Sequence, residues 1–167
     1  GDVGWVHLNI AFRDCSNLTT FNLGTGNTSN VQDFTTMFYN CAGLTTLDLT
    51  NFDTSSAIKL TSMFQYCSGL TTLDLSSFDT SNVTSVLRMV SSCTSLTTLD
   101  LSNFNTSNVN TMMQMFYGCT NLTSIDVTSF DTSNVVNMTQ MFRNCLNLTS
   151  LDISNFDTSS VTGLGYM

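Results

Sequence analysis

The sequence predicts an α/β repeat solenoid with 26 residues per coil, in which parallel strands line one face and short helices line the other. The first observation behind this prediction is the spacing of the cysteines, since each lies 26 residues after the one before. The second is that the apolar residues keep the same register in every unit. The third is that each unit combines apolar residues at every second position with apolar residues three or four apart. The cysteines are Cys15, Cys41, Cys67, Cys93, Cys119 and Cys145.

The first half of each unit has the pattern of a half-buried strand. In Leu47-Asp48-Leu49 two apolar residues flank a polar one, which is the two-residue period of a strand with one buried side. A single strand cannot bury its own apolar edge, but copies stacked about 4.8 Å apart can do so. We therefore expect parallel strands, one from each coil, to form a continuous face.

The second half of each unit has the spacing of a short helix, partly 3₁₀ in character. Between Val31 and Cys41 the apolar residues recur at Phe34, Met37 and Phe38, which would form one stripe on a helix. A cluster of the type Asp-Thr-Ser-Asn precedes the stripe, and such residues favour Asx turns and helix N-caps. We therefore expect the acids of this cluster to cap the helices. They are Asp53, Asp79, Asp131 and Asp157, with Asn105 in the place between Asp79 and Asp131.

Residues 1–167 are expected to form a single array of about six repeats. The first unit departs from the consensus, with Asn22 in place of the strand Asp and Gly26 in place of Phe. The last unit stops at Met167, without an atypical polar repeat after it. Because a solenoid without capping repeats exposes its core at the ends, we expect a piece of a longer array that can self-associate through uncapped ends.

Composition and charge argue against two classes of partner. The formal net charge is −8, with only 4 Lys and Arg residues, and these form no basic stripe that could neutralise phosphates or anionic lipids. No stretch approaches the roughly 20 apolar residues that a membrane-spanning helix needs. We therefore expect neither nucleic-acid binding nor membrane insertion.

The cysteine column allows three interpretations. Coils stacked at strand spacing would place neighbouring Cα atoms roughly 5 Å apart, which a disulfide can span. However, Cys41 ends the apolar stripe, so its side chain should point inward and pack as a small buried thiol. A metal site is the third interpretation, although the spacing differs from the C-x₂-C of zinc sites. Buried free thiols fit the pattern best.

The central residue of each predicted strand forms a line of acids. Each lies between two inward leucines, so it should point outward, and carboxylates about 5 Å apart repel by roughly 0.8 kcal/mol in water. Flanking hydroxyls such as that of Thr50, or cations such as Ca²⁺, would offset this repulsion. A solvated structural ladder, a ligand-binding face and a weak cation site all remain open. The ligand-binding interpretation assigns the site to Thr46, Asp48, Thr72, Asp74, Thr98, Asp100, Asp126 and Asp152.

Other surface positions change from coil to coil, which indicates exposure to solvent. Catalysis is not expected, because the chain has 1 His and no Glu, and a ladder of identical carboxylates does not separate into an acid and a base. No cofactor or metal site is expected either. One such column contains Arg13, Tyr39, Gln65, Ser91, Tyr117 and Arg143.

The unit L-D-L-S-x-F-D-T-S-N-V, followed by M-F-x-x-C, resembles the bacterial surface protein 26-residue repeat, a family related to BspA-like leucine-rich repeat proteins. The resemblance covers about residues 8–167, and Leu44-x-x-Leu47-x-Leu49 is similar to the strand signature of leucine-rich repeats. It implies a leucine-rich-repeat-like fold in a secreted or wall-attached bacterial protein, often an adhesin. Phe52 stands where a standard repeat carries Asn or Cys, so no Asn ladder is expected.

These observations lead to two functional hypotheses. The first is a non-catalytic, adhesin-like binding module on the bacterial cell surface, which presents its Asp/Thr/Ser strand face to an extracellular protein or glycan. The alternative is a structural stalk, spacer or self-assembling array without a specific ligand. Ice binding by the Thr45 column is disfavoured, because charged Asp side chains lie on the same face.

Overall fold

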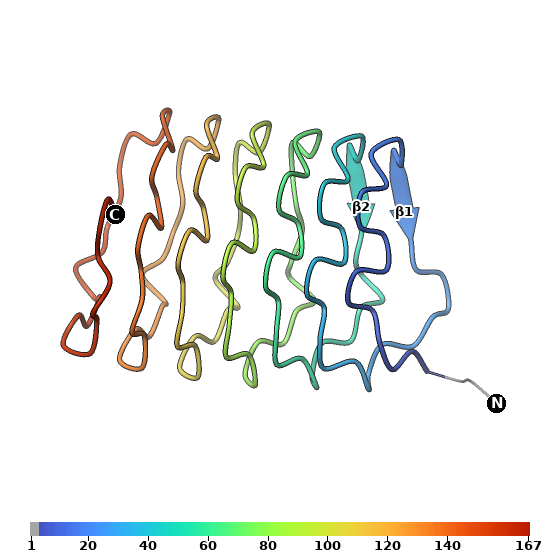
Figure 1. The fold of residues 1–167 in the computed structure, drawn as a ribbon, viewed down its shortest axis with the longest axis horizontal. Helices are drawn as coiled ribbons and strands as arrows, with labels where there is room; N and C mark the ends of the chain where they lie inside the picture. The colour runs from blue at the N-terminus through green and yellow to red at the C-terminus, as the bar shows by residue number, and fades with distance from the viewer. Residues whose placement is uncertain (1–3) are drawn as a thin grey trace.

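The computed structural model describes residues 4–167 as a stack of flattened coils that run parallel to one another (Figure 1). The coils repeat every 26 residues, so that Thr20 pairs with Thr46 in the next coil. The first and last coils lie at opposite ends of the stack (Figure 1). Residues 1–3 of the expected array lie outside the described residues.

Strand pairing is confined to one step of the stack. Strands β1 (Thr20–Asn22) and β2 (Thr46–Asp48) pair in parallel and are the only strands within residues 4–167. The later Leu-Asp-Leu segments lie side by side without forming strands, joined by isolated backbone bonds such as that from Thr97 N to Thr71 O at 3.3 Å. The prediction that one strand from each coil forms a continuous face is therefore wrong.

The Leu-Asp-Leu segments are short because their own acid ends them. Oδ1 of Asp74 accepts a hydrogen bond from the backbone N–H of Ser76 at 2.9 Å, which is an Asx turn. The chain therefore changes direction directly after the acid. The same turn follows β2, where Asp48 accepts from Thr50 N at 3.1 Å, so the turn limits the length of each extended segment and not its pairing.

The described residues contain no helix, so the predicted leucine-rich-repeat-like α/β class is wrong. Residues 34–44 form a series of tight turns, in which the N–H groups of Met37, Tyr39, Cys41 and Leu44 each bond to the carbonyl three residues earlier. Within this series Thr36 has a φ of 54°, and Asn40, four residues later, has one of 56°. A left-handed residue every four positions interrupts any right-handed helix. The helical face was predicted because a turn series places apolar residues at the same three- and four-residue spacings.

The alternate N–H groups of this turn series bond to the next coil. Phe34 N donates to Lys59 O at 3.0 Å, and Phe38 N donates to Met63 O at 2.9 Å. The same connection recurs along the stack as a column of parallel bridges. These bridges join Asp33, Lys59, Ser85, Thr111, Asn137 and Gly163 in order. We call this side of the stack, formed by residues 34–41 and their equivalents, the turn face.

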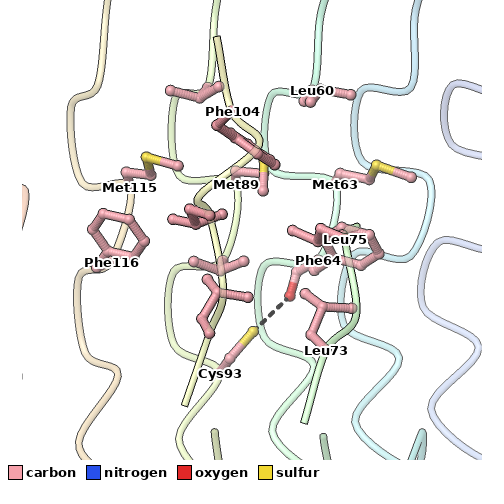
Figure 2. Packing of buried hydrophobic residues seen from close by; sticks show 14 of the residues in the cluster. Leu60, Met63, Phe64, Leu73, Leu75, Met89, Cys93, Phe104, Met115 and Phe116 are labelled. Atoms are coloured by element: carbon pink, nitrogen blue, oxygen red, sulfur yellow. Dashed lines mark hydrogen bonds between the residues drawn. The ribbon is translucent and has the colours of Figure 1, made fainter. Parts of the chain in front are cut away.

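The core lies between the turn face and the Leu-Asp-Leu segments (Figure 2). Most of the Met and Phe columns lie in this core: Met63 and Met89 are fully buried and Phe78 is 2% exposed, whereas Phe156 is partly buried. Aromatic rings stack along the axis of the stack, with the ring centroids of Phe38 and Phe64 5.9 Å apart and nearly parallel. Identical side chains thus pack against their own copies from coil to coil.

The cysteine column lies at the edge of this core as buried free thiols. Cys41, Cys67, Cys93 and Cys119 are buried, whereas Cys15 is exposed. The Sγ of Cys93 donates to the carbonyl of Phe64 in the preceding coil at 3.1 Å (Figure 2). The other four cysteines that follow Cys15 make the same bond to the coil before them.

A ladder of buried threonines, which the sequence patterns did not predict, joins the coils at another corner. The Oγ1 of Thr54 donates to the carbonyl of Asp79 at 3.0 Å and accepts from the backbone N–H of the same residue at 2.8 Å. One hydroxyl therefore satisfies both backbone groups of a residue in the next coil. The members of this ladder are Thr28, Thr54, Thr80, Thr106 and Thr132, each at most 2% exposed.

One smaller expectation is also corrected. Asp53 accepts from the backbone N–H of Ser55 at 3.0 Å in an Asx turn, and the described residues contain no helix for it to cap. One residue before the Phe column, Asn alternates with Ser from coil to coil. Asn103 Nδ2 donates to the carbonyl of Phe78 in the preceding coil at 2.9 Å.

Candidate functional site

The residues assigned to the candidate site lie along one exposed line of the stack. Thr46 and Asp48 belong to β2, and their equivalents occupy the same place in later Leu-Asp-Leu segments. The expected outward direction of the acids is confirmed, because every member is exposed while the flanking Leu73 and Leu75 are buried. We call this line the acid face; it consists of Thr46, Asp48, Thr72, Asp74, Thr98, Asp100, Asp126 and Asp152.

Each acid of this face is held by the residue two positions later. Oδ1 of Asp126 accepts from the backbone N–H of Thr128 at 2.9 Å and from its hydroxyl at 2.6 Å. Asp48 makes the same two bonds to Thr50. The Asp side chains are therefore fixed in direction. The hydroxyls that hold them follow the acids, and no bond joins an acid to the hydroxyl of Thr46, Thr72 or Thr98 within residues 4–167.

Hydrogen bonding outweighs repulsion along the acid face. The backbone N–H and hydroxyl of Ser102 lower the pKa of Asp100, while the neighbouring carboxylates of Asp74 and Asp126 act in the opposite direction with a smaller effect. The hydroxyl and backbone N–H of Thr50 likewise lower the pKa of Asp48. The acids therefore stay ionised at neutral pH, and the face presents a line of fixed negative charges.

The second oxygen of most of these carboxylates remains unused. Oδ2 of Asp48 accepts from Asn22, but in the described part of the chain Oδ2 of Asp74, Asp100 and Asp126 has no hydrogen-bond donor. Between the last two coils, Asp126, Thr128 and Asp152 line a shallow hollow of about 350 Å³. The face thus offers regularly spaced acceptors over a surface with little relief.

No three His, Cys, Asp or Glu side chains within residues 4–167 lie close enough together to hold a metal ion. The same part of the chain has no helix long and apolar enough to cross a membrane. What the acid face can do chemically is accept hydrogen bonds and attract cationic groups.

A family model described as "Mycoplasma protein of unknown function, DUF285" matches residues 6–123 and, in a second match, residues 88–167. The chain belongs to the DUF285 family. The two DUF285 matches overlap, as expected when one repeat can be aligned in more than one register. The match is consistent with a bacterial surface repeat family. No curated protein and no solved structure matches the chain.

Proposed function

We propose that this DUF285 protein is a non-catalytic, adhesin-like binding module on the bacterial cell surface, and that its acid face contacts an extracellular protein or glycan. The observation that carries this proposal is the fixed line of ionised, exposed acids, most of them with an oxygen free to accept. A relation to BspA-like leucine-rich repeat proteins is part of the proposal, and its support is the L-D-L-S-x-F-D-T-S-N-V unit.

The charge pattern supports a partner of complementary chemistry. Asp74, Asp100 and Asp126 occupy successive coils, so a partner with evenly spaced basic or hydroxyl groups can contact several of them at once. Individual exposed ion pairs are weak, but several in register add up. Their contribution falls as salt screens the charges, with a Debye length of about 8 Å at physiological ionic strength.

The test is a binding assay of the purified protein against extracellular-matrix proteins and glycans, with and without Ca²⁺, at two salt concentrations. Replacing Asp74, Asp100 and Asp126 together with Asn removes three charges from the acid face and keeps the side-chain shape. We expect binding to weaken by about tenfold or more and to lose most of its salt dependence.

The matched control removes three charges from the neighbouring corner by replacing Asp53, Asp79 and Asp131 with Asn. Asn105 already occupies this column and accepts from Ser107 N at 3.0 Å, so Asn is accommodated there. Equal losses in both triple variants would indicate a response to net charge and would contradict a site on the acid face.

The second candidate function is a structural spacer or self-assembling array. The observation in its favour is the uniformity of the coil-to-coil contacts, since each cysteine after the first donates to the carbonyl 29 residues earlier. Sedimentation velocity over a wide concentration range distinguishes the two. Growing assemblies and silence in the binding assay favour the spacer, whereas a monomer with a saturable partner favours the binding module.

A further inference from the structure

The turn face concentrates the aromatic and cationic side chains of this acidic protein. All 4 tyrosines and three of the 4 basic residues fall in three columns of that face, namely the columns that contain Arg88, Tyr39 and Tyr66. The fourth basic residue, Lys59, lies in a neighbouring column, 3.7 Å from Asp33. From residue 34 onward, the three columns contain no acid. Their members include Tyr39, Tyr66, Arg88, Tyr117, Arg143 and Tyr166.

Several of these side chains line a groove that runs across several coils. The groove encloses about 480 Å³, within the range of roughly 300–1,000 Å³ typical of ligand sites. Tyr39, Tyr66 and Tyr117 line it together with Arg88. The rings of Tyr39 and Tyr66 meet edge to face with centroids 5.4 Å apart, and the guanidinium of Arg13 lies 4.8 Å from the centroid of Tyr39.

The groove is also lined by three largely buried polar residues whose side chains have no partner in the described chain. Ser62, Gln65 and Ser91 line it and are 6%, 8% and 2% exposed, respectively. Within residues 4–167, the side-chain amide of Gln65 and the hydroxyls of Ser62 and Ser91 make no hydrogen bond to protein atoms. Their polar atoms stay open to the groove, since the buried side-chain oxygen without a partner in the described residues is that of Thr36, so these three offer donors and acceptors to a ligand.

The left-handed backbone beneath the groove recurs in every coil and fixes the direction of one column of side chains. Ser62 and Arg88 have φ values of 53° and 54°, and Gln114 one of 56°. In this left-handed region glycine is the favoured residue, because other side chains there are strained. The chain nevertheless displays polar side chains at these positions. Arg88 Nε donates to Gln114 Oε1, which directs the guanidinium along the groove, and Arg88 has no acidic partner in the described chain.

We propose that this groove binds an oligosaccharide that carries carboxylates. Tyrosine rings offer flat apolar surfaces against which the C–H faces of sugar rings pack. Arg88 matches a carboxylate, because its planar guanidinium can donate two parallel hydrogen bonds. The free groups of Ser62, Gln65 and Ser91 match the hydroxyls of a sugar. Since the groove crosses coils, it accommodates several sugar units in a row.

An acidic polypeptide fits the same groove less well. Peptides recognised in grooves usually anchor apolar side chains in apolar pockets or pair with a free strand edge. This groove is lined by tyrosine, arginine, glutamine and serine, without an aliphatic side chain. The lining therefore favours a ligand whose whole length is polar, with flat C–H faces between its hydroxyls.

The test uses isothermal titration calorimetry of the full chain with a hexasaccharide of hyaluronate, in which every second sugar carries a carboxylate. A neutral six-glucose dextran fragment and polyglutamate serve as comparison ligands. We expect saturable binding of the hyaluronate fragment and at least tenfold weaker binding of the other two. Arg88→Gln, which introduces the side chain that Gln114 has in the same column, should weaken hyaluronate binding by about tenfold. Tyr66→Ala, at a side chain that is 42% exposed, should do the same.

Two further variants make the result specific. Arg88→Lys keeps the charge but loses the paired hydrogen bonds, so it should also weaken binding. Arg143→Gln removes an equal charge outside the groove and should change the affinity by less than about twofold. Circular dichroism melts establish that each variant is folded.

The proposal is overturned if hyaluronate does not bind, or if binding is indifferent to Arg88→Gln. It is also overturned if polyglutamate binds equally well and Tyr66→Ala has no effect, because simple charge attraction would then account for the binding. This groove is independent of the acid face. The triple Asn variant at Asp74, Asp100 and Asp126 should therefore retain hyaluronate binding even if it no longer binds the partner of the acid face.

Discussion

Asn22 Nδ2 donates a hydrogen bond to Asp48 Oδ2 at 2.6 Å, across the step at which β1 and β2 pair. At every later step of this column an Asp stands next to an Asp, and no strand forms in residues 49–167. An amide can donate to a neighbouring carboxylate, whereas two ionised carboxylates repel each other. The two segments that pair as strands are thus the ones in which an Asn, and not an Asp, lies next to the Asp of the following coil.

Replacing Asn22 with Asp should therefore lower the Tm. Aspartate can still accept from Gly24 N, as Asn22 does at 2.6 Å, but it cannot donate to Asp48. We expect a decrease of about 2–4 °C, and a smaller decrease at high salt. Thermal unfolding followed by circular dichroism measures it.

Asn105→Asp is the matched control for that substitution. It adds the same charge in the other column, but Asn105 accepts from Ser107 and donates no bond to the next acid. A decrease as large as that of Asn22→Asp would show that charge alone matters and that the amide bond to Asp48 does not.

The threonine ladder predicts a large effect from a small change. Thr80→Val preserves shape but removes the hydroxyl that donates to Asn105 O at 3.0 Å and accepts from Asn105 N at 2.8 Å. Both backbone groups of Asn105 would lose a bond that is partly shielded from solvent, so the free energy of unfolding should fall by about 1–3 kcal/mol. Urea denaturation measures the loss. Thr97→Val, at an exposed threonine, should change it by less than about 0.5 kcal/mol, and equal losses would contradict a role for the ladder.

The exposed cysteine should react with thiol reagents faster than the buried ones. Cys15 is exposed, whereas Cys41, Cys67, Cys93 and Cys119 are buried. Since the thiolate is the reactive form, burial suppresses reaction both by blocking access and by raising the pKa of Cys67 to about 12. We expect a disulfide reagent at pH 8 to modify Cys15 quickly and the buried four only on unfolding. Rapid modification of Cys67 in the folded protein would contradict the buried column.

The same thiols predict a loss of stability in alkali. Burial raises the pKa of Cys119 from 9.0 to about 12, so the folded state keeps a proton that the unfolded state releases. This contribution is full below pH 9 and is lost as the pH rises from 9 to about 12. Each such thiol should lower the free energy of unfolding by about 1.4 kcal/mol per pH unit in that range. Melts between pH 8 and 11 under reducing conditions test this, and Cys119→Ala should reduce the slope.

Some of the structure could be predicted because identical positions share one environment. The 26-residue period places Met63 and Met89 in the same surroundings, so one inward side chain implies the others. The outward direction of the acids followed from the alternation around Asp48 in the same way. These inferences need only the period and the polarity of each column.

The helices were wrong because spacing alone does not determine backbone conformation. Phe34, Met37 and Phe38 fit one face of a helix and equally fit a turn series with left-handed residues at Thr36 and Asn40. Asn tolerates that conformation, but threonine does so rarely, so the sequence carries little sign of it. The hydrogen bonds that favour the turns go to another coil, beyond the range of any local pattern.

The sequence contained a sign of the threonine ladder, but the polar residues around each Thr pointed to an exposed turn. Thr54 and Thr80 occupy a position that holds Thr in every coil, while the residue before it varies between Asp and Asn. Asp-Thr-Ser-Asn suggests an exposed turn, so a buried hydroxyl was not expected there. For the groove of the turn face, the sequence showed only that one column of residues varies from coil to coil. The groove itself could not be predicted, because its lining comes from several coils at once.

The bonds from Phe34 to Lys59 and from Phe38 to Met63 connect adjacent coils along the length of the stack. A force that pulls the two ends of the stack apart therefore acts on the contacts of one step at a time. A coil that opens releases 26 residues, or about 90 Å of extended chain. Under load the stack behaves as an extensible tether that lengthens in discrete increments, with the coils still closed remaining intact.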